Sequence, residues 1–171
     1  PGLFLSKEKV AEIMANSEKI NTDTIDASSF SSEQAEWDKA IDGMQFINIK
    51  KTKFKAYMLL VKDASRVKVG VSSDNFSSAL EGKRIFDIVK KYDAIAAINA
   101  GEFVDTGGMG NGARPMGLTY SSGKVVWSDG LTRTFMGFDN NNNLICKNSM
   151  TKAEAEKLGI RDAVSFQNGN V

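Results

Sequence analysis

From residue 45 onward, apolar and polar residues alternate in short runs, and this period of two indicates β-strands. The alternation predicts strands at residues 45–50, 54–60 and 67–71. Further strand-like runs lie at residues 117–120, 124–127, 135–138, 144–146 and 163–166. Short connections join the first three strands, which predicts an antiparallel meander. Two hairpins are indicated further on, because strand-like runs flank Ser121-Ser122-Gly123 and the asparagine-rich turn at 139–143.

A helical period of about 3.6 residues replaces this alternation elsewhere. Helices are predicted over residues 6–17, 31–44, 82–92 and 151–158. Capping-box pairs mark two of their starts, Ser31 with Gln34 and Thr151 with Glu154, and Gly159 suits the position just after the last helix. Together these elements predict an α+β fold with a mixed, largely antiparallel sheet, packed helices and a helical N-terminal extension.

The run Ala94–Ile98 stands apart from the alternating strands because it carries no polar residue. Such a run predicts a strand that is buried on both faces. It leads into polar residues and then into the glycine-rich loop 107–112. A strand fixes position, and glycines let backbone and ligand approach closely, so this arrangement is typical of a site. Asn99, at the end of the strand, and Glu102 are therefore predicted to face one cleft.

Glu102, Asp105 and Arg114 are charged residues of this stretch that carry candidate chemistry. Burial near a sheet edge can bring a carboxylate into the range of acid–base catalysis, and a guanidinium fork fits phosphate oxygens. Each residue also has an ordinary interpretation. Glu102 and Asp105 are consistent with solvated loop carboxylates, and Arg114 is consistent with a surface arginine.

Composition narrows the classes of function. The 171 residues include 22 Lys and Arg against 21 Asp and Glu, and a net charge of +1 gives no reason to expect a nucleic-acid partner. No apolar run approaches the roughly 20 residues of a membrane helix. The chain has no histidine, which excludes Ser-His-Asp, Cys-His and histidine–zinc sites within it. The single Cys146 is predicted to be buried and inert, and any cofactor or metal is unknown.

Two short motifs are rejected on their context. Gly108-x-Gly110-x-x-Ala113 has the spacing of a dinucleotide fingerprint, but strand-like residues follow it where a helix should open. Asp139-x-Asn141-x-Asn143 matches the start of a calcium loop. There, Leu144 occupies the position that requires glycine, and Met150 occupies that of the bidentate glutamate. A hairpin turn is the better interpretation of that segment.

Several segments, taken in order, resemble the phosphodiester glycosidase family, which includes N-acetylglucosamine-1-phosphodiester α-N-acetylglucosaminidases. Residues 94–103, AIAAINAGEF, are similar to its AxxAINGGFF segment, although Ala100 and Glu102 depart from that pattern. The other similar segments are residues 114–118, 122–126, 135–139 and 162–165. The similarity runs from about residue 45 to the C-terminus. Later family segments, RTAxG-like and DGGGS-like, have no counterpart, so 45–171 resembles the N-terminal part of a catalytic domain, preceded by a helical extension over 1–44.

The resemblance implies a hydrolase that cleaves a sugar-1-phosphodiester in cell-surface or exopolysaccharide material, hence outside the cytoplasm. Residues 1–5 lack the features of a secretory signal, and the sequence leaves open whether one was removed. A carbohydrate or sugar-phosphate ligand is expected. The C-terminal remainder of the same protein, or a second copy, is expected to complete the sheet.

In this interpretation the site residues fall between residues 99 and 114. Asn99 and Glu102 are the catalytic candidates, and the substrate-binding candidates are Gly101, Phe103, Asp105 and Arg114. Asn99 would hydrogen-bond sugar or phosphate, while Glu102 would assist proton transfer. Two other classes stay open: a non-catalytic glycan-binding or cell-wall-attached module, and a scaffold fragment without activity.

Overall fold

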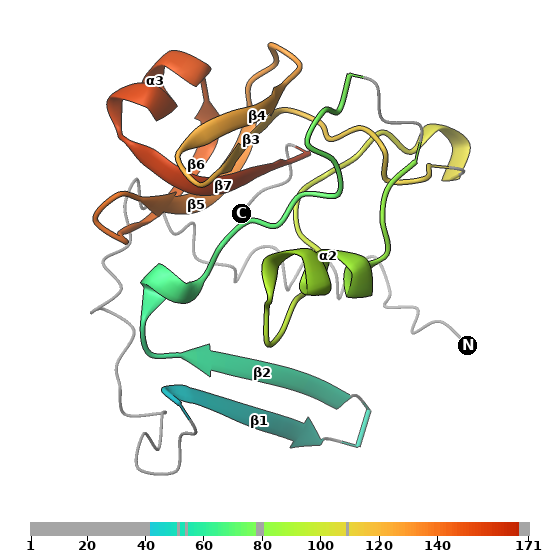
Figure 1. Cartoon of the computed structure of the whole chain (residues 1–171), viewed down its shortest axis with the longest axis vertical. Helices are drawn as coiled ribbons and strands as arrows, with labels where there is room; N and C mark the ends of the chain where they lie inside the picture. Colours follow the sequence, from blue (N-terminus) through green and yellow to red (C-terminus); the bar gives the residue numbers. More distant parts are fainter. Residues whose placement is uncertain (1–41, 51, 54, 78–80, 109, 168–171) are drawn as a thin grey trace, which may run out of the picture.

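The computed structural model describes residues 42–50, 52–53, 55–77, 81–108 and 110–167 (Figure 1). The predicted helix at 6–17 lies outside the described residues. Most of the predicted helix at 31–44 does so too, and with it most of the helical extension assigned to residues 1–44. The description below therefore concerns the part of the chain that begins just before the first strand.

An antiparallel sheet of five strands, in the order β4-β3-β7-β5-β6, forms the main body of the molecule. Its strands are β3 Leu118–Ser121, β4 Lys124–Ser128, β5 Arg133–Asp139, β6 Leu144–Met150 and β7 Ile160–Phe166. Both predicted hairpins, β3–β4 and β5–β6, are confirmed. The last strand, β7, is central, because it pairs with β3 on one side and β5 on the other. The expectation that the strand at 163–166 lacks a neighbouring strand is therefore wrong for the described residues.

Local turn chemistry explains why the hairpins form. Ser122 and Gly123 both take left-handed backbone angles, with φ of 53° and 74°, as a tight two-residue turn requires. In the second turn, Oδ1 of Asp139 accepts hydrogen bonds from the backbone N–H groups of Asn141, at 2.8 Å, and Asn143, at 2.9 Å. The carboxylate thus closes its own hairpin, as the rejection of a calcium loop predicts.

The core lies between this sheet and α3, Lys152–Lys157. Its fully buried members include Phe135 and Ala155, each 0% exposed. Both hydrogen bonds of the predicted capping box form at the start of α3, between Thr151 and Glu154. Gly159, with φ of 64°, follows the helix as predicted. Cys146 on β6 is only partly buried, whereas the prediction was a buried thiol. Burial raises the pKa of this thiol, which agrees with the predicted lack of reactivity.

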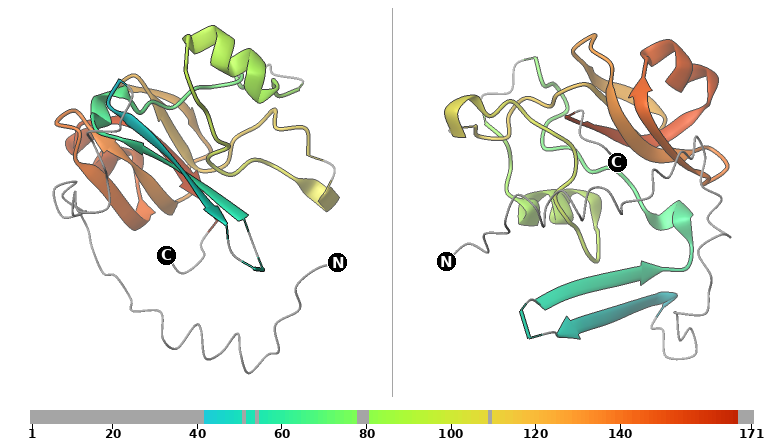
Figure 2. Two further views of the ribbon diagram at one scale, coloured as in Figure 1. Left: turned by 90° about the horizontal axis from the view of Figure 1, so that it is seen from below. Right: turned by 180° about the vertical axis from the view of Figure 1, so that it is seen from behind.

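A second, two-stranded sheet precedes the main one. Its strands, β1 Met44–Lys50 and β2 Lys55–Val61, pair in antiparallel register along their whole length. Figure 2 shows this ribbon apart from the five-stranded sheet, with the short helix η4, Ala64–Arg66, at the end of β2. The first two strands of the predicted meander are confirmed.

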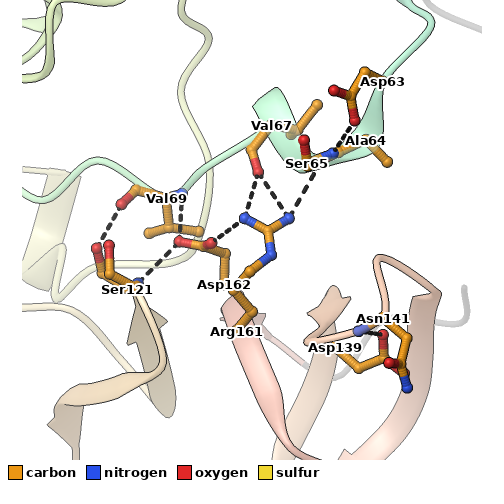
Figure 3. Close-up of polar contacts among 11 residues, drawn as sticks. Asp63, Ala64, Ser65, Val67, Val69, Ser121, Asp139, Asn141, Arg161 and Asp162 are labelled. Atoms are coloured by element: carbon orange, nitrogen blue, oxygen red, sulfur yellow. Dashed lines mark hydrogen bonds and ion pairs between the residues drawn. The ribbon is translucent and has the colours of Figure 1, made fainter.

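The third strand of the meander, predicted at 67–71, does not form. Its polar backbone groups are hydrogen-bonded by side chains rather than by a neighbouring strand (Figure 3). The Val69 N–H donates to Oδ1 of Asp162 at 3.0 Å, and the Val69 carbonyl accepts from Ser121 Oγ at 2.8 Å. Arg161 reaches the carbonyl of Val67 at 3.2 Å. A side-chain anchor of this kind has no periodic signature, so alternation alone predicts a strand.

The predicted helix at 82–92 is confirmed as α2, Ile85–Tyr92, with a later start. It packs on the chain at Gly70, where a Cβ would meet Ile88 Cγ2 at 2.9 Å. The hydroxyl of Tyr92 accepts a hydrogen bond from the Val71 N–H at 3.1 Å. Asp93, with φ of 48°, ends the helix in a left-handed conformation.

The buried strand predicted at 94–98 is wrong. The segment is neither a strand nor buried, since Ile95 is 72% and Ile98 is 88% exposed. A strand buried on both faces needs a place inside a sheet, and β7, β3 and β5 occupy the interior positions of the larger one. The apolar run therefore has no strand partner among the described residues.

The predicted fold class is confirmed only in part, as a largely antiparallel fold that contains both strands and helices. The described residues form two antiparallel sheets with two α-helices, so the fold is rich in strands. Every pairing between named strands is antiparallel, and the predicted mixed sheet is not observed in this part of the chain. No helix among the described residues is long and apolar enough to cross a membrane.

Candidate functional site

Glu102 is held in a short extended segment that is inserted between the end of β7 and the residues before β3. The Glu102 N–H donates to the carbonyl of Ser165 at 2.9 Å, and the Met116 N–H donates to the Glu102 carbonyl at 2.9 Å. Phe103 and Pro115 form an antiparallel bridge beside it. Hydrogen bonds on both sides fix the backbone here, which sets the direction of the Glu102 side chain.

This inserted segment forms the floor of an open cleft with a volume of about 700 Å³. The residues that line the cleft come from the inserted segment, the approach to β3 and the end of β7: Gly101, Glu102, Phe103, Val104, Asp105, Met116, Phe166 and Gln167. The structure thus brings together Gly101, Glu102, Phe103 and Asp105 among the predicted site residues. Two carboxylates, two aromatic rings and an amide provide both polar and apolar contacts for a ligand.

Gly101 allows the chain to enter this segment. Its φ of 73° lies in the left-handed region, and a Cβ there would approach the Cβ of Val164 to 3.2 Å. A side chain at this position would therefore be strained and crowded against β7. The glycine places Glu102 next to the C-terminal end of β7, where the carbonyl of Ser165 accepts a hydrogen bond from the Glu102 N–H.

An ion pair behind the cleft orients the Glu102 carboxylate. Nη1 of Arg133, on β5, lies 3.3 Å from Oε2 of Glu102, and the two side chains are 13% and 22% exposed. On its other side, Nε of Arg133 lies 3.7 Å from Oδ2 of Asp129. Asp129 is itself fixed, because its two oxygens accept from the N–H groups of Gly117, at 2.7 Å, and Leu131, at 2.9 Å. A partly buried guanidinium between two carboxylates holds all three groups in place.

Arg133 and Asp129 were not among the site residues predicted from the sequence. Arg133 lies 31 residues from Glu102 along the chain, and its apolar neighbours on β5 predict only a strand. The sequence carries no local signal for the pair, because the contact depends on β5 and the inserted segment meeting through β7.

Asp105 has a structural contact within the glycine-rich loop. Its Oδ1 accepts a hydrogen bond from the Gly110 N–H at 2.6 Å, which closes the loop around η5, Thr106–Gly108. A Cβ on Gly110 would lie 2.6 Å from the carbonyl oxygen of Val104, so only glycine fits that closure. Asp105 still lines the cleft, with one oxygen engaged.

Asn99 and Arg114 are not among the residues that line the cleft. Asn99 is exposed in the segment that replaces the predicted buried strand, so it does not occupy the strand end on which its predicted role depends. Arg114 is exposed as well, and its carbonyl accepts a hydrogen bond from the Val104 N–H at 2.9 Å. Its backbone therefore supports the cleft floor from the neighbouring segment.

Among the described residues, no group of three or more His, Cys, Asp or Glu side chains is placed to hold a metal ion. Comparisons with protein-family models, with curated proteins and with solved structures found no match for this chain.

Proposed function

We propose that the cleft around Glu102 binds the sugar of a sugar-1-phosphodiester and that the protein hydrolyses the bond between the anomeric carbon and the phosphate oxygen. The single observation that supports this proposal best is the gathering of Gly101, Glu102, Phe103 and Asp105 around one cleft. Gly101, Glu102 and Phe103 belong to the segment 94–103 that resembles the phosphodiester glycosidases, and Asp105 follows it closely. Site residues that are contiguous in sequence and converge on a cleft are a reasonable candidate site.

The proposed reaction needs one proton acceptor. The oxygen of a water molecule attacks the anomeric carbon. The bond between that carbon and the phosphate oxygen breaks, and the phosphomonoester leaves with the bonding electrons. Glu102 takes the proton that the water loses. A phosphomonoester is a stable anion, so its departure does not depend on a second carboxyl group as acid. Glu102 suits the role of base because Arg133 holds its carboxylate at 3.3 Å in a fixed direction.

The lining suits an uncharged sugar ring better than the phosphate. It contains the carboxylates of Glu102 and Asp105 and, among the described residues, no lysine or arginine. Phe103 is 41% exposed and offers an apolar surface to the ring. Arg114 is exposed next to the cleft floor, where its carbonyl accepts a hydrogen bond from the Val104 N–H at 2.9 Å. In this proposal Arg114 meets the phosphate at the rim.

A non-catalytic glycan-binding cleft is the second candidate. One observation favours it: both carboxylates of the lining already have partners, Glu102 with Arg133 and Asp105 with the Gly110 N–H. A cleft whose carboxylates serve mainly as fixed hydrogen-bond acceptors can bind sugar hydroxyls without reacting.

The two candidates separate in one pair of assays. Hydrolysis is followed by the release of phosphomonoester from a GlcNAc-1-phosphodiester, and binding is followed by calorimetry with the same compound. The Glu102→Gln variant should lose at least about 100-fold in rate, because a positioned base contributes that much, while the variant still binds. Glu156→Gln, at an exposed position of α3, is the matched control and should keep full activity.

Binding without hydrolysis by the unmodified protein would select the glycan-binding candidate. Neither binding nor hydrolysis would reject both candidates. An equal loss of activity in the Glu102 and Glu156 variants would show that removal of a charge, rather than of a base, had been measured.

A further inference from the structure

Asn111 and Gly112 form an asparagine–glycine pair in the loop that leads from the cleft towards β3. Neither residue lines the cleft. Asn111 is exposed, and Gly112 takes a left-handed φ of 70°. A Cβ on Gly112 would meet nothing closer than the Cα of Gly82, at 4.0 Å. Because glycine carries no side chain, the backbone nitrogen of Gly112 is open to the side chain that precedes it.

The Asn111 side chain folds back along its own backbone. Its Oδ1 accepts a hydrogen bond from the Ala113 N–H at 3.1 Å, which closes an Asx turn. The ring that this bond closes runs through Cγ, Cβ, Cα and the carbonyl carbon of Asn111 and then through the nitrogen of Gly112. These are all the atoms of a succinimide ring. The turn therefore restricts the side chain to conformations in which Cγ faces the neighbouring nitrogen.

Two hydrogen bonds activate the two groups that would react. The Ala113 N–H draws electron density towards Oδ1 of Asn111, which favours attack on Cγ and stabilises the charge that Oδ1 then gains. The Gly82 N–H donates to the Asn111 carbonyl at 3.0 Å. That carbonyl and the Gly112 nitrogen belong to one peptide group, so this bond stabilises the anion that forms when the nitrogen loses its proton. The Gly112 N–H itself donates to no other described residue.

We propose that Asn111 is a deamidation site of the folded protein, with water as the co-reactant. The Gly112 nitrogen loses its proton to hydroxide and attacks Cγ, so that a bond between nitrogen and Cγ forms. The bond between Cγ and Nδ2 breaks, and ammonia leaves after Nδ2 takes a proton from water. Water then adds to either carbonyl carbon of the succinimide and opens the ring, which leaves aspartate or isoaspartate at position 111. The sum of these steps exchanges an amide for a carboxylate without any oxidation or reduction.

The modification changes the contact between this loop and the chain before α2. A Cβ on Gly82 would lie 2.7 Å from the carbonyl oxygens of both Asn111 and Gly112, so the two backbones are in tight contact. Isoaspartate places its Cβ in the main chain and thereby lengthens the backbone at this point. The tight contact has no room for that insertion. The isoaspartate product should therefore lose the hydrogen bond from the Gly82 N–H, and the loop gains a negative charge.

Incubation of the folded protein at mildly alkaline pH, followed by peptide mass spectrometry, tests the proposal. The peptide that contains Asn111 should gain the mass by which a hydroxyl exceeds an amino group, and isoaspartate should appear in it. Gly112→Ala should slow this change at least about tenfold, because a Cβ shields the nitrogen. The matched control is Gly108→Ala, which also has a left-handed φ, 73°, and open space for its Cβ. This control leaves the pair intact and should deamidate like the unmodified protein.

The chain unfolded in urea is the reference, because it shows the reactivity of the asparagine–glycine pair without the fold. Asn111 should deamidate in the folded protein at least as fast as in the unfolded chain, since only the fold supplies the hydrogen bond from Gly82. A slower rate in the folded protein would mean that the fold protects Asn111, and it would overturn the proposal. Equal rates in Gly112→Ala and Gly108→Ala would overturn it too, because the Gly112 nitrogen would then not be the attacking group.

Discussion

The five-stranded sheet and the segment Ala94–Ala100 are both built from apolar residues, yet their environments are opposite. Phe135 and Ile145, in the sheet, are 0% and 3% exposed, whereas Ile95 and Ile98 are 72% and 88% exposed. The difference lies in the backbone. β5 and β7 pair over most of their length, while the segment has no strand partner among the described residues. An apolar run becomes a buried strand only where neighbouring strands can accept its N–H and C=O groups.

Glycines show the same contrast between a packed region and an open one. At Gly137 on β5, a Cβ would lie 2.2 Å from the Cβ of Ala163, so the sheet leaves no room for a side chain. At Gly107 and Gly108, in the loop next to the cleft, nothing lies within 4 Å of such an atom. The sheet is constrained by packing, and the loop that borders the cleft is constrained mainly by hydrogen bonds such as that of Asp105.

The largest effect is expected from truncation of the core. Phe135→Ala should lower the free energy of unfolding by about 3–5 kcal/mol, because it removes a fully buried ring and leaves a cavity. Ile95→Ala, in the exposed segment, should change it by less than about 0.5 kcal/mol. Urea denaturation at a low protein concentration measures both. Similar losses in the two variants would erase the contrast between sheet and segment.

The next largest effect concerns the anchor between the sheet and the chain at Val69. Asp162 is 2% exposed and accepts from the N–H groups of Val69 and Ser122 and from Arg161. Asp162→Ala should cost about 3 kcal/mol, because it leaves a partly buried guanidinium without its partner. Asp74→Asn, which breaks a largely exposed pair with Lys91, is the control and should change little. Equal midpoints for the two variants in urea would contradict the assigned role of Asp162.

A smaller effect is expected where the two regions meet. Gly101→Ala should cost about 1–3 kcal/mol, since φ is 73° and the new Cβ would crowd Val164. Gly123→Ala shares the left-handed angle, with φ of 74°, but faces open space, so it reports the backbone strain alone. The difference between the two variants in thermal unfolding measures the crowding at the cleft floor. Calorimetry should also show weaker sugar binding for Gly101→Ala only.

The smallest effect is expected at the capping box of α3. Thr151→Ala should cost about 1 kcal/mol, because it removes the hydrogen bond to the Glu154 N–H. Hydrogen bonds from the Thr151 side chain and backbone lower the pKa of Glu154. This stabilisation is therefore complete above the ordinary glutamate pKa of 4.5 and is lost as the pH falls through the lower folded value. Denaturation curves of the variant should show a weaker dependence on pH in that range, and an unchanged dependence would contradict the assignment.

Local sequence signals predicted the hairpins and the start of α3 well, because turns and caps depend on residues close together in the chain. Ser122, Gly123 and Asp139 form their turns with immediate neighbours, and Thr151 reaches only as far as Glu154. The candidate site was predicted in part. Glu102 and its neighbours were found from the change of composition after the apolar run, whereas Asn99 was placed at the end of a strand that does not form.

The sequence by itself determined which segments turn, which cap a helix and which are apolar enough to pair. Only the tertiary structure decided that β7 lies between β3 and β5, that Arg133 meets Glu102, and that Ala94–Ala100 is left outside the sheet. The physical reason is distance along the chain. A turn or cap is settled by interactions between neighbours, but strand order and ion pairs depend on competition between remote segments for the same hydrogen-bonding partners.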